Sequence, residues 1–158
     1  MPNQKSRIVL IVVTVALAGL GGCSLRGVAS NMPTDALDHA IGDAVGDPTT
    51  CVIIAERTTR KAVYTYGESA NCARDLPPCD RPGTLSANAA VALADEPDDR
   101  AASCPSNDDG SRRVGWAEGR VISKRGNWIY SAMMEGEKTL PGQEISARLA
   151  LAFKKAGL

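Results

Sequence analysis

The chain is poor in aromatic residues and contains a single histidine. Phe, Trp and Tyr make up 4% of its 158 residues, and alanine is abundant. Basic and acidic residues balance at 18 each, so the formal net charge is zero. The concentrated basic excess that marks a nucleic-acid-binding protein is absent, and we expect no nucleic-acid partner. The few aromatics predict a core of small and aliphatic side chains.

Several motifs of metal and redox chemistry are also missing. There is no C-x-x-C, so nothing in the sequence supports a thioredoxin-like role. The closest spacing in the folded part, Cys72 to Cys79, is C-x6-C, whereas structural zinc sites usually contain pairs such as C-x2-C. Zinc is therefore a disfavoured alternative for the cysteines. We expect no cofactor apart from a covalent lipid.

Catalytic residues are hard to find. His39 sits beside the apolar stripe of a predicted helix, where a flanking position is favoured over a general base. The segment GESAN (67–71) departs from the Gly-x-Ser-x-Gly nucleophile motif at Asn71. The acidic stretches at 95–99 and 108–109 lack the alternating oxygen ligands of a calcium loop. A basic stretch at 112–125 predicts a solvated mixed face, with lipid head groups, peptidoglycan carboxylates or a partner as alternatives.

The N-terminus predicts an exported protein. Lys5 and Arg7 precede an almost unbroken apolar run, Ile8–Leu20, and small residues follow it. This pattern is typical of a secretory signal peptide. The alternative is a transmembrane anchor, but spanning a bilayer takes about 20 apolar residues. The run has 13 before Gly21 and Gly22 interrupt it.

The end of the apolar run, Leu20-Gly21-Gly22-Cys23, resembles the lipobox of bacterial lipoproteins. The resemblance implies diacylglycerol on the Cys23 thiol and cleavage before it, so residues 1–22 form the signal peptide and 23–33 a lipidated tether. An aspartate directly after the lipidated cysteine would resemble an inner-membrane retention signal. Ser24 occupies this position instead, which favours the outer membrane, facing the periplasm. Several acyl chains hold a protein firmly, since each buried methylene contributes about 0.8 kcal/mol.

The remaining cysteines are even in number. With Cys23 acylated, the mature chain of 136 residues keeps four others, which we expect to be disulfide-bonded outside the cytoplasm: Cys51, Cys72, Cys79 and Cys104. Four cysteines allow three pairings. We favour Cys72 with Cys79, which flank a short proline-containing loop, and Cys51 with Cys104.

Residues 34–158 read as a single α+β domain. Apolar periodicity and turn residues predict, in order, a helix at 34–45, strands at 51–57 and 61–67, a loop at 69–83, a helix at 84–95, a loop at 96–113, strands at 114–122 and 127–137, and a helix that begins at Pro141 and ends at Gly157. Hairpins imply antiparallel pairing, so we expect a sheet of four or five antiparallel strands packed by about three helices, after an N-terminal signal helix.

This order of elements resembles profilin-like (roadblock-type) domains and a serine β-lactamase-type sandwich without its helical half. Both likenesses are topological and imply no function by themselves. The β-lactamase nucleophile motif, Ser-x-x-Lys, is absent: Ser86 begins the second helix, but Ala89 stands three residues on. We therefore expect Ser86 to cap the helix.

Aromatic residues in the last hairpin are candidates for a binding patch. Trp116, Trp128 and Tyr130 lie on its two strands, where the tryptophans can share a face. If exposed, they mark a binding surface; if buried, they are core, which the scarcity of aromatics favours.

The sequence thus predicts a membrane-anchored periplasmic lipoprotein with a non-enzymatic role in binding or envelope assembly, partnered by an envelope protein or peptidoglycan. Two alternatives remain, a small hydrolase-like envelope enzyme and a profilin-like domain that binds a small ligand. A pocket beside the sheet with convergent polar groups favours the alternatives, and an exposed aromatic patch favours the first interpretation.

Overall fold

The computed structural model describes residues 32–93 and 99–158. The predicted signal peptide, Cys23 and most of the predicted tether lie outside this part. Along the chain, the elements are α1 (Thr34–Val45), β1 (Cys51–Glu56), β2 (Ala62–Tyr66), α2 (Ser69–Cys72), α3 (Ala87–Leu93), β3 (Arg100–Pro105), β4 (Arg113–Ile122), β5 (Asn127–Gly136) and α4 (Gly142–Lys155). No helix in the described ranges is long and apolar enough to cross a membrane.

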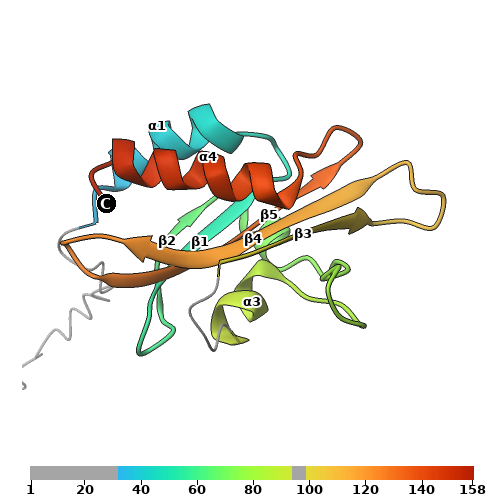
Figure 1. Ribbon diagram of the computed structural model, residues 1–158, viewed down its shortest axis with the longest axis horizontal. Coiled ribbons are helices and arrows are strands. Elements are labelled where there is room, and N and C mark those ends of the chain that lie inside the picture. The colour runs from blue at the N-terminus through green and yellow to red at the C-terminus, as the bar shows by residue number, and fades with distance from the viewer. Residues whose placement is uncertain (1–31, 94–98) are drawn as a thin grey trace, which may run out of the picture.

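The strands form one antiparallel sheet in the order β2-β1-β5-β4-β3. Helices α1 and α4 lie side by side across one face, and α3 packs on the other (Figure 1). The predicted α+β class, with an antiparallel sheet packed by helices, is confirmed.

The face under α1 and α4, here called the two-helix face, holds the larger core. Its helices bury the stripes that their periodicity predicts, including Leu37 and Ile41 of α1 and Leu149 and Phe153 of α4. Asp35 suits the positive N-terminal end of α1. Pro33 is the N-cap of α1 and Thr34 its first helical residue, although threonine is the better capping residue of the two. Gly157, at φ +83°, ends α4 as predicted.

The opposite face, here called the α3 face, packs against α2, α3 and the loop between them. Every second residue of β5 points to it, from Ile129 through Ser131 and Met133 to Glu135. Ser86 accepts a hydrogen bond from the Ala89 N–H (3.2 Å), which confirms its capping role at the start of α3.

One predicted loop, 96–113, contains a strand. β3 pairs along β4 from Arg100 to Pro105 as an edge strand of the sheet. It has no apolar alternation because its side chains are exposed or half-buried, so its sequence, RAASCP, lacks the signal of a strand that covers a core.

Both favoured disulfide pairings are wrong. The bonds join Cys51 to Cys72 and Cys79 to Cys104, with Cα atoms 5.2 and 5.4 Å apart. Cys51 lies on β1 and Cys104 on β3, which are separated by β5 and β4. Three strand spacings put them roughly 14 Å apart, beyond the reach of a disulfide. The α3 face brings β1 next to α2 and the loop at Cys79 next to the edge strand instead.

Candidate functional site

The three candidates for an aromatic binding patch are buried, as the favoured interpretation predicts. Trp116, Trp128 and Tyr130 are each 3–4% exposed. The tryptophans also lie on opposite faces of the sheet: Trp116 on the α3 face, Trp128 on the two-helix face. Tyr130 stacks edge-on against Phe153, with ring centroids 5.2 Å apart. These residues therefore belong to the core and form no exposed patch.

Two buried glutamates lie on the α3 face, and their surroundings differ. Glu135 of β5 is 1% exposed and Glu118 of β4 is 8% exposed. In the register of the two strands, Glu118 is opposite Ser131 and Glu135 is opposite Val114. A buried carboxylate is costly unless it is paired and hydrogen-bonded, so what surrounds each glutamate decides what it can do.

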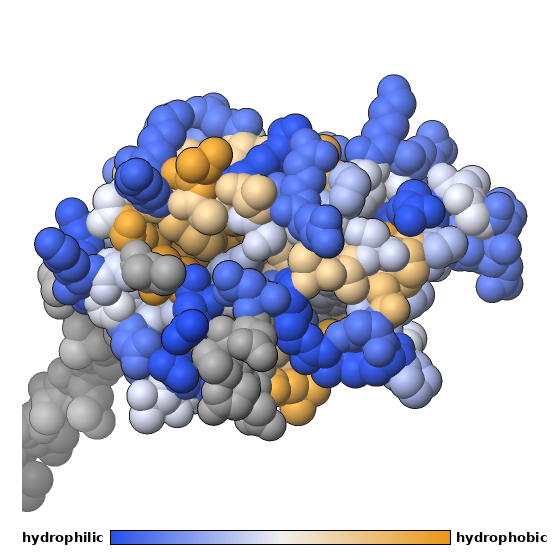
Figure 2. Space-filling model, viewed as in Figure 1, coloured by the Kyte–Doolittle hydropathy of each residue, from blue (hydrophilic) through white to orange (hydrophobic). Residues whose placement is uncertain are grey.

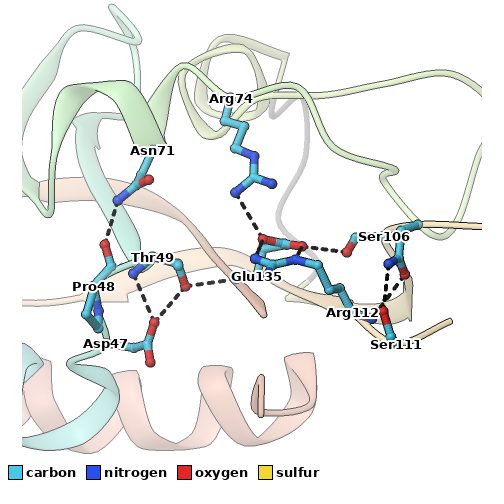
Figure 3. Close-up of polar contacts among 10 residues, drawn as sticks. Asp47, Pro48, Thr49, Asn71, Arg74, Ser106, Ser111, Arg112 and Glu135 are labelled. Atoms are coloured by element: carbon cyan, nitrogen blue, oxygen red, sulfur yellow. Dashed lines mark hydrogen bonds and ion pairs between the residues drawn. The ribbon is translucent and has the colours of Figure 1, made fainter. Parts of the chain in front are cut away.

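Glu135 has a full set of partners (Figure 3). The Arg112 guanidinium donates to both carboxylate oxygens at 2.6 Å, the Ser106 hydroxyl donates at 2.7 Å, and Arg74 approaches at 3.0 Å. These donors come from the β3–β4 hairpin and from the segment after α2. They hold the pKa of Glu135 at about 2, chiefly through the Arg112 hydrogen bonds.

The network extends from Glu135 to the segment before β1 (Figure 3). The Glu135 N–H donates to Thr49 Oγ1 (3.4 Å), whose hydroxyl donates to Asp47 (2.7 Å). A cavity of about 320 Å³ opens beside it, lined partly by Arg112 and Glu135. Because Glu135 occupies Nε and Nη2 of Arg112, this guanidinium is committed to the fold, and we assign the network a structural role.

Glu118 lies in a groove toward the β3 edge of the same face. The groove has a volume of about 290 Å³, near the lower end of the range for small-molecule pockets. It lies where β3 and β4 meet the loop at 78–80. Its lining consists of Pro78, Asp80, Asp99, Arg100, Ala101, Ala102, Trp116 and Glu118, and we call it the Glu118 groove.

The neighbours of Glu118 are engaged elsewhere. Asp80 forms ion pairs with both Arg100 and Arg81. The Asp99 carboxylate lies at the Gly119–Arg120 backbone of β4, where it accepts a hydrogen bond from the Arg120 N–H (3.4 Å). The Glu118 carboxyl makes no hydrogen bond or ion pair with any residue in 32–93 or 99–158. Burial raises its pKa, and the charges of Arg100 and Arg81 only partly oppose this.

Ser131, opposite Glu118 in the strand register, is fully buried. Its hydroxyl oxygen lacks a hydrogen-bond partner within the described part of the chain. Trp116, two residues before Glu118, donates its indole N–H to the Pro77 carbonyl at 2.7 Å, which fixes the ring beneath the 77–80 loop. The Glu118 groove thus combines a fixed indole with a carboxyl that has no hydrogen-bonding or ion-pairing partner among residues 32–93 and 99–158.

Replacing Glu118 by glutamine is expected to raise the free energy of unfolding at pH 7 by about 1 kcal/mol, because the amide carries no charge to desolvate. The folded-state pKa is raised, so Glu118 favours folding below its unfolded pKa and loses that contribution as the pH rises through the folded value. Urea unfolding at pH 7 and pH 4 measures this. A loss of stability at pH 7 would show that the carboxylate has a partner.

A third hollow, between α1 and α4, is mostly apolar. Leu151 is 70% exposed there, beside Ala44 and Ala152, and the Asp43–Lys155 ion pair (2.9 Å) borders it. Figure 2 shows hydrophobic surface over this helical layer among charged side chains. Nothing in the structure indicates what covers it.

The structure also locates the other candidates. His39 is exposed on α1, and within the described ranges no group of three or more His, Cys, Asp or Glu residues is arranged to hold a metal ion. Sequence reasoning missed both glutamates. The alternation of β4 and β5 places them on the α3 face, but no local signal shows that this face is covered.

No family model, curated protein or solved structure matches the chain.

Proposed function

We propose that the protein is a bacterial lipoprotein, anchored through lipid on Cys23 to the periplasmic side of the outer membrane, whose α+β domain binds a small ligand without catalysing a reaction. The observation that supports the lipid anchor is that four of the five cysteines are disulfide-bonded to one another. Both disulfides lie within the folded domain and take up Cys51, Cys72, Cys79 and Cys104. Cys23 is left as the fifth cysteine, directly after the lipobox-like segment.

The disulfides also support a location in the periplasm. Disulfides persist in oxidising environments such as the periplasm and are rare in the cytosol. Ten residues, 24–33, separate Cys23 from the start of α1 at Thr34 and are available to hold the domain away from the bilayer.

The Glu118 groove favours a small ligand over a protein-binding aromatic patch. It lies beside the sheet and contains a fixed indole and a buried carboxyl, whereas the aromatic side chains proposed for a patch are core.

Replacing Cys23 by alanine is expected to abolish acylation. In bacteria fed an alkyne-tagged palmitate, the wild-type protein should be labelled and Cys23→Ala should carry no label, because the thiol is the attachment point. Ser24→Ala is the matched control and should be labelled like the wild type. Label on Cys23→Ala, or none on the wild type, would refute the anchor.

A further inference from the structure

The contrast between the two buried glutamates points to a ligand. Both lie on the α3 face of one sheet and both are more than nine-tenths buried. The fold supplies Glu135 with two arginines and a serine hydroxyl. It supplies Glu118 with no hydrogen-bonding or ion-pairing partner in the described part of the chain, although Arg100 lies near enough for its charge to act on the carboxyl.

The arginines near Glu118 do not form an ion pair with it. Arg100 and Arg81 both pair with Asp80, so their positive charge is shared with another carboxylate. The carboxyl of Glu118 faces a groove that opens to solvent. A positively charged N–H donor entering that groove would replace the missing partner with a charge-assisted hydrogen bond, about twice as strong as a neutral one.

The rest of the lining suits an organic ion. Trp116, Ala102 and Pro78 line the groove beside Glu118. The indole is 3% exposed and is held in place by its hydrogen bond to Pro77. A metal ion requires several ligands, and the described residues assemble no such group. An alkyl chain, by contrast, can lie along the indole and the methyl group of Ala102 while its charged end meets the carboxylate.

We propose that the Glu118 groove binds an aliphatic primary amine, with the ammonium group on Glu118 and the methylene chain along Trp116. The ammonium comes either from a free diamine or from a lysine side chain displayed by a peptide; the two share this chemistry. This inference rests on the proposed function, in which the α+β domain binds a small ligand. Its test reads the groove alone, with or without the lipid.

The test uses the two tryptophans as internal reporters. The full-length chain, labelled with ¹⁵N and purified in detergent, is titrated at pH 7 and constant ionic strength with cadaverine. The Trp116 indole N–H signal should shift and saturate, because this ring lies in the groove. The chemical shift of the Trp128 indole N–H should not change, because this ring lies on the two-helix face, under α1 and α4. No saturable shift at Trp116, or equal shifts at both rings, would overturn the proposal.

Glu118→Gln keeps the shape of the side chain and removes its charge. It should weaken cadaverine binding by about tenfold or more, as expected for loss of one charge-assisted hydrogen bond. An unchanged Trp128 signal confirms that the variant folds. Asp108→Asn, an exposed carboxylate in the β3–β4 hairpin, is the matched control and should bind as the wild type does. Equal binding by Glu118→Gln and the wild type would overturn the assignment.

A second titration with Nα-acetyl-lysine amide separates the sources. Binding as strong as that of cadaverine assigns the groove to a displayed lysine, and weaker binding assigns it to a free amine. The anchor is not at issue in either titration: a chain that binds cadaverine but carries no lipid would leave this inference intact and refute the proposed anchor.

Discussion

Replacing Glu135 by alanine is expected to lower the free energy of unfolding by about 3 kcal/mol, because removing one partner from a buried ion pair leaves the others uncompensated. Arg112 and Ser106 would lose the carboxylate that joins the β3–β4 hairpin to β5. Arg74 would lose the same carboxylate, which joins the segment after α2 to β5. Both guanidiniums are about 40% exposed, which limits the cost because water can solvate them. Urea unfolding at pH 7 measures the loss.

The matched control is Glu137→Ala, two residues along the chain and exposed. Its stability should stay within about 0.5 kcal/mol of the wild type, as is usual for surface substitutions. Equal stabilities for Glu135→Ala and Glu137→Ala would contradict a structural role for the network.

Acid should weaken the same network. The folded-state pKa of Glu135 is lowered from 4.5 to about 2, so its contribution is fully present above the unfolded pKa and is lost as the pH falls from about 5 to about 2. Glu135→Gln should flatten this part of the stability profile. A profile as steep as that of the wild type would place the acid sensitivity elsewhere.

Removing the buried disulfide is expected to have a similarly large effect. The Cys51–Cys72 bond spans 21 residues, and closing such a loop stabilises the folded state by about 3 kcal/mol through the entropy of the unfolded chain. Cys51 is fully buried and Cys72 is 2% exposed, so the Cys51→Ala/Cys72→Ala variant also loses packing in the core of the α3 face. Its urea midpoint should fall below that of the wild type.

The second disulfide provides the comparison. The Cys79–Cys104 bond spans 25 residues, so the entropic contribution is nearly the same, but both cysteines are only partly buried. The Cys79→Ala/Cys104→Ala variant should therefore be the more stable of the two. In the wild type, dithiothreitol should reduce Cys79–Cys104 first, since access governs exchange. Reduction in the reverse order would contradict the burial of Cys51.

Local patterns predicted most of the fold. The stripes of α1 and α4 and the alternation in β4 and β5 are visible in the sequence because each covers a core. β3 has no such pattern, since an edge strand of small and polar residues buries little, and its pairing with β4 is non-local. The predicted disulfide pairing was wrong because the pairing depends on the order of strands in the sheet. Proximity in the sequence does not determine that order.

The candidate site was less predictable than the fold. Glu118 and Glu135 lie on strands whose alternation was recognised, but the partners of Glu135 come from residues 23 to 61 positions away. What distinguishes Glu118 is the lack of such a partner among the described residues, which only tertiary structure reveals. The burial of the aromatic residues was predictable: in a chain with six of them, the core takes them.

The intact mass of the protein extracted from membranes, alkylated without prior reduction, tests the central claim most directly. A lipid-anchored, disulfide-bonded lipoprotein should have lost residues 1–22, gained acyl chains on Cys23 and taken up no alkylating reagent. A mass without acyl chains and with alkylated thiols would contradict the account.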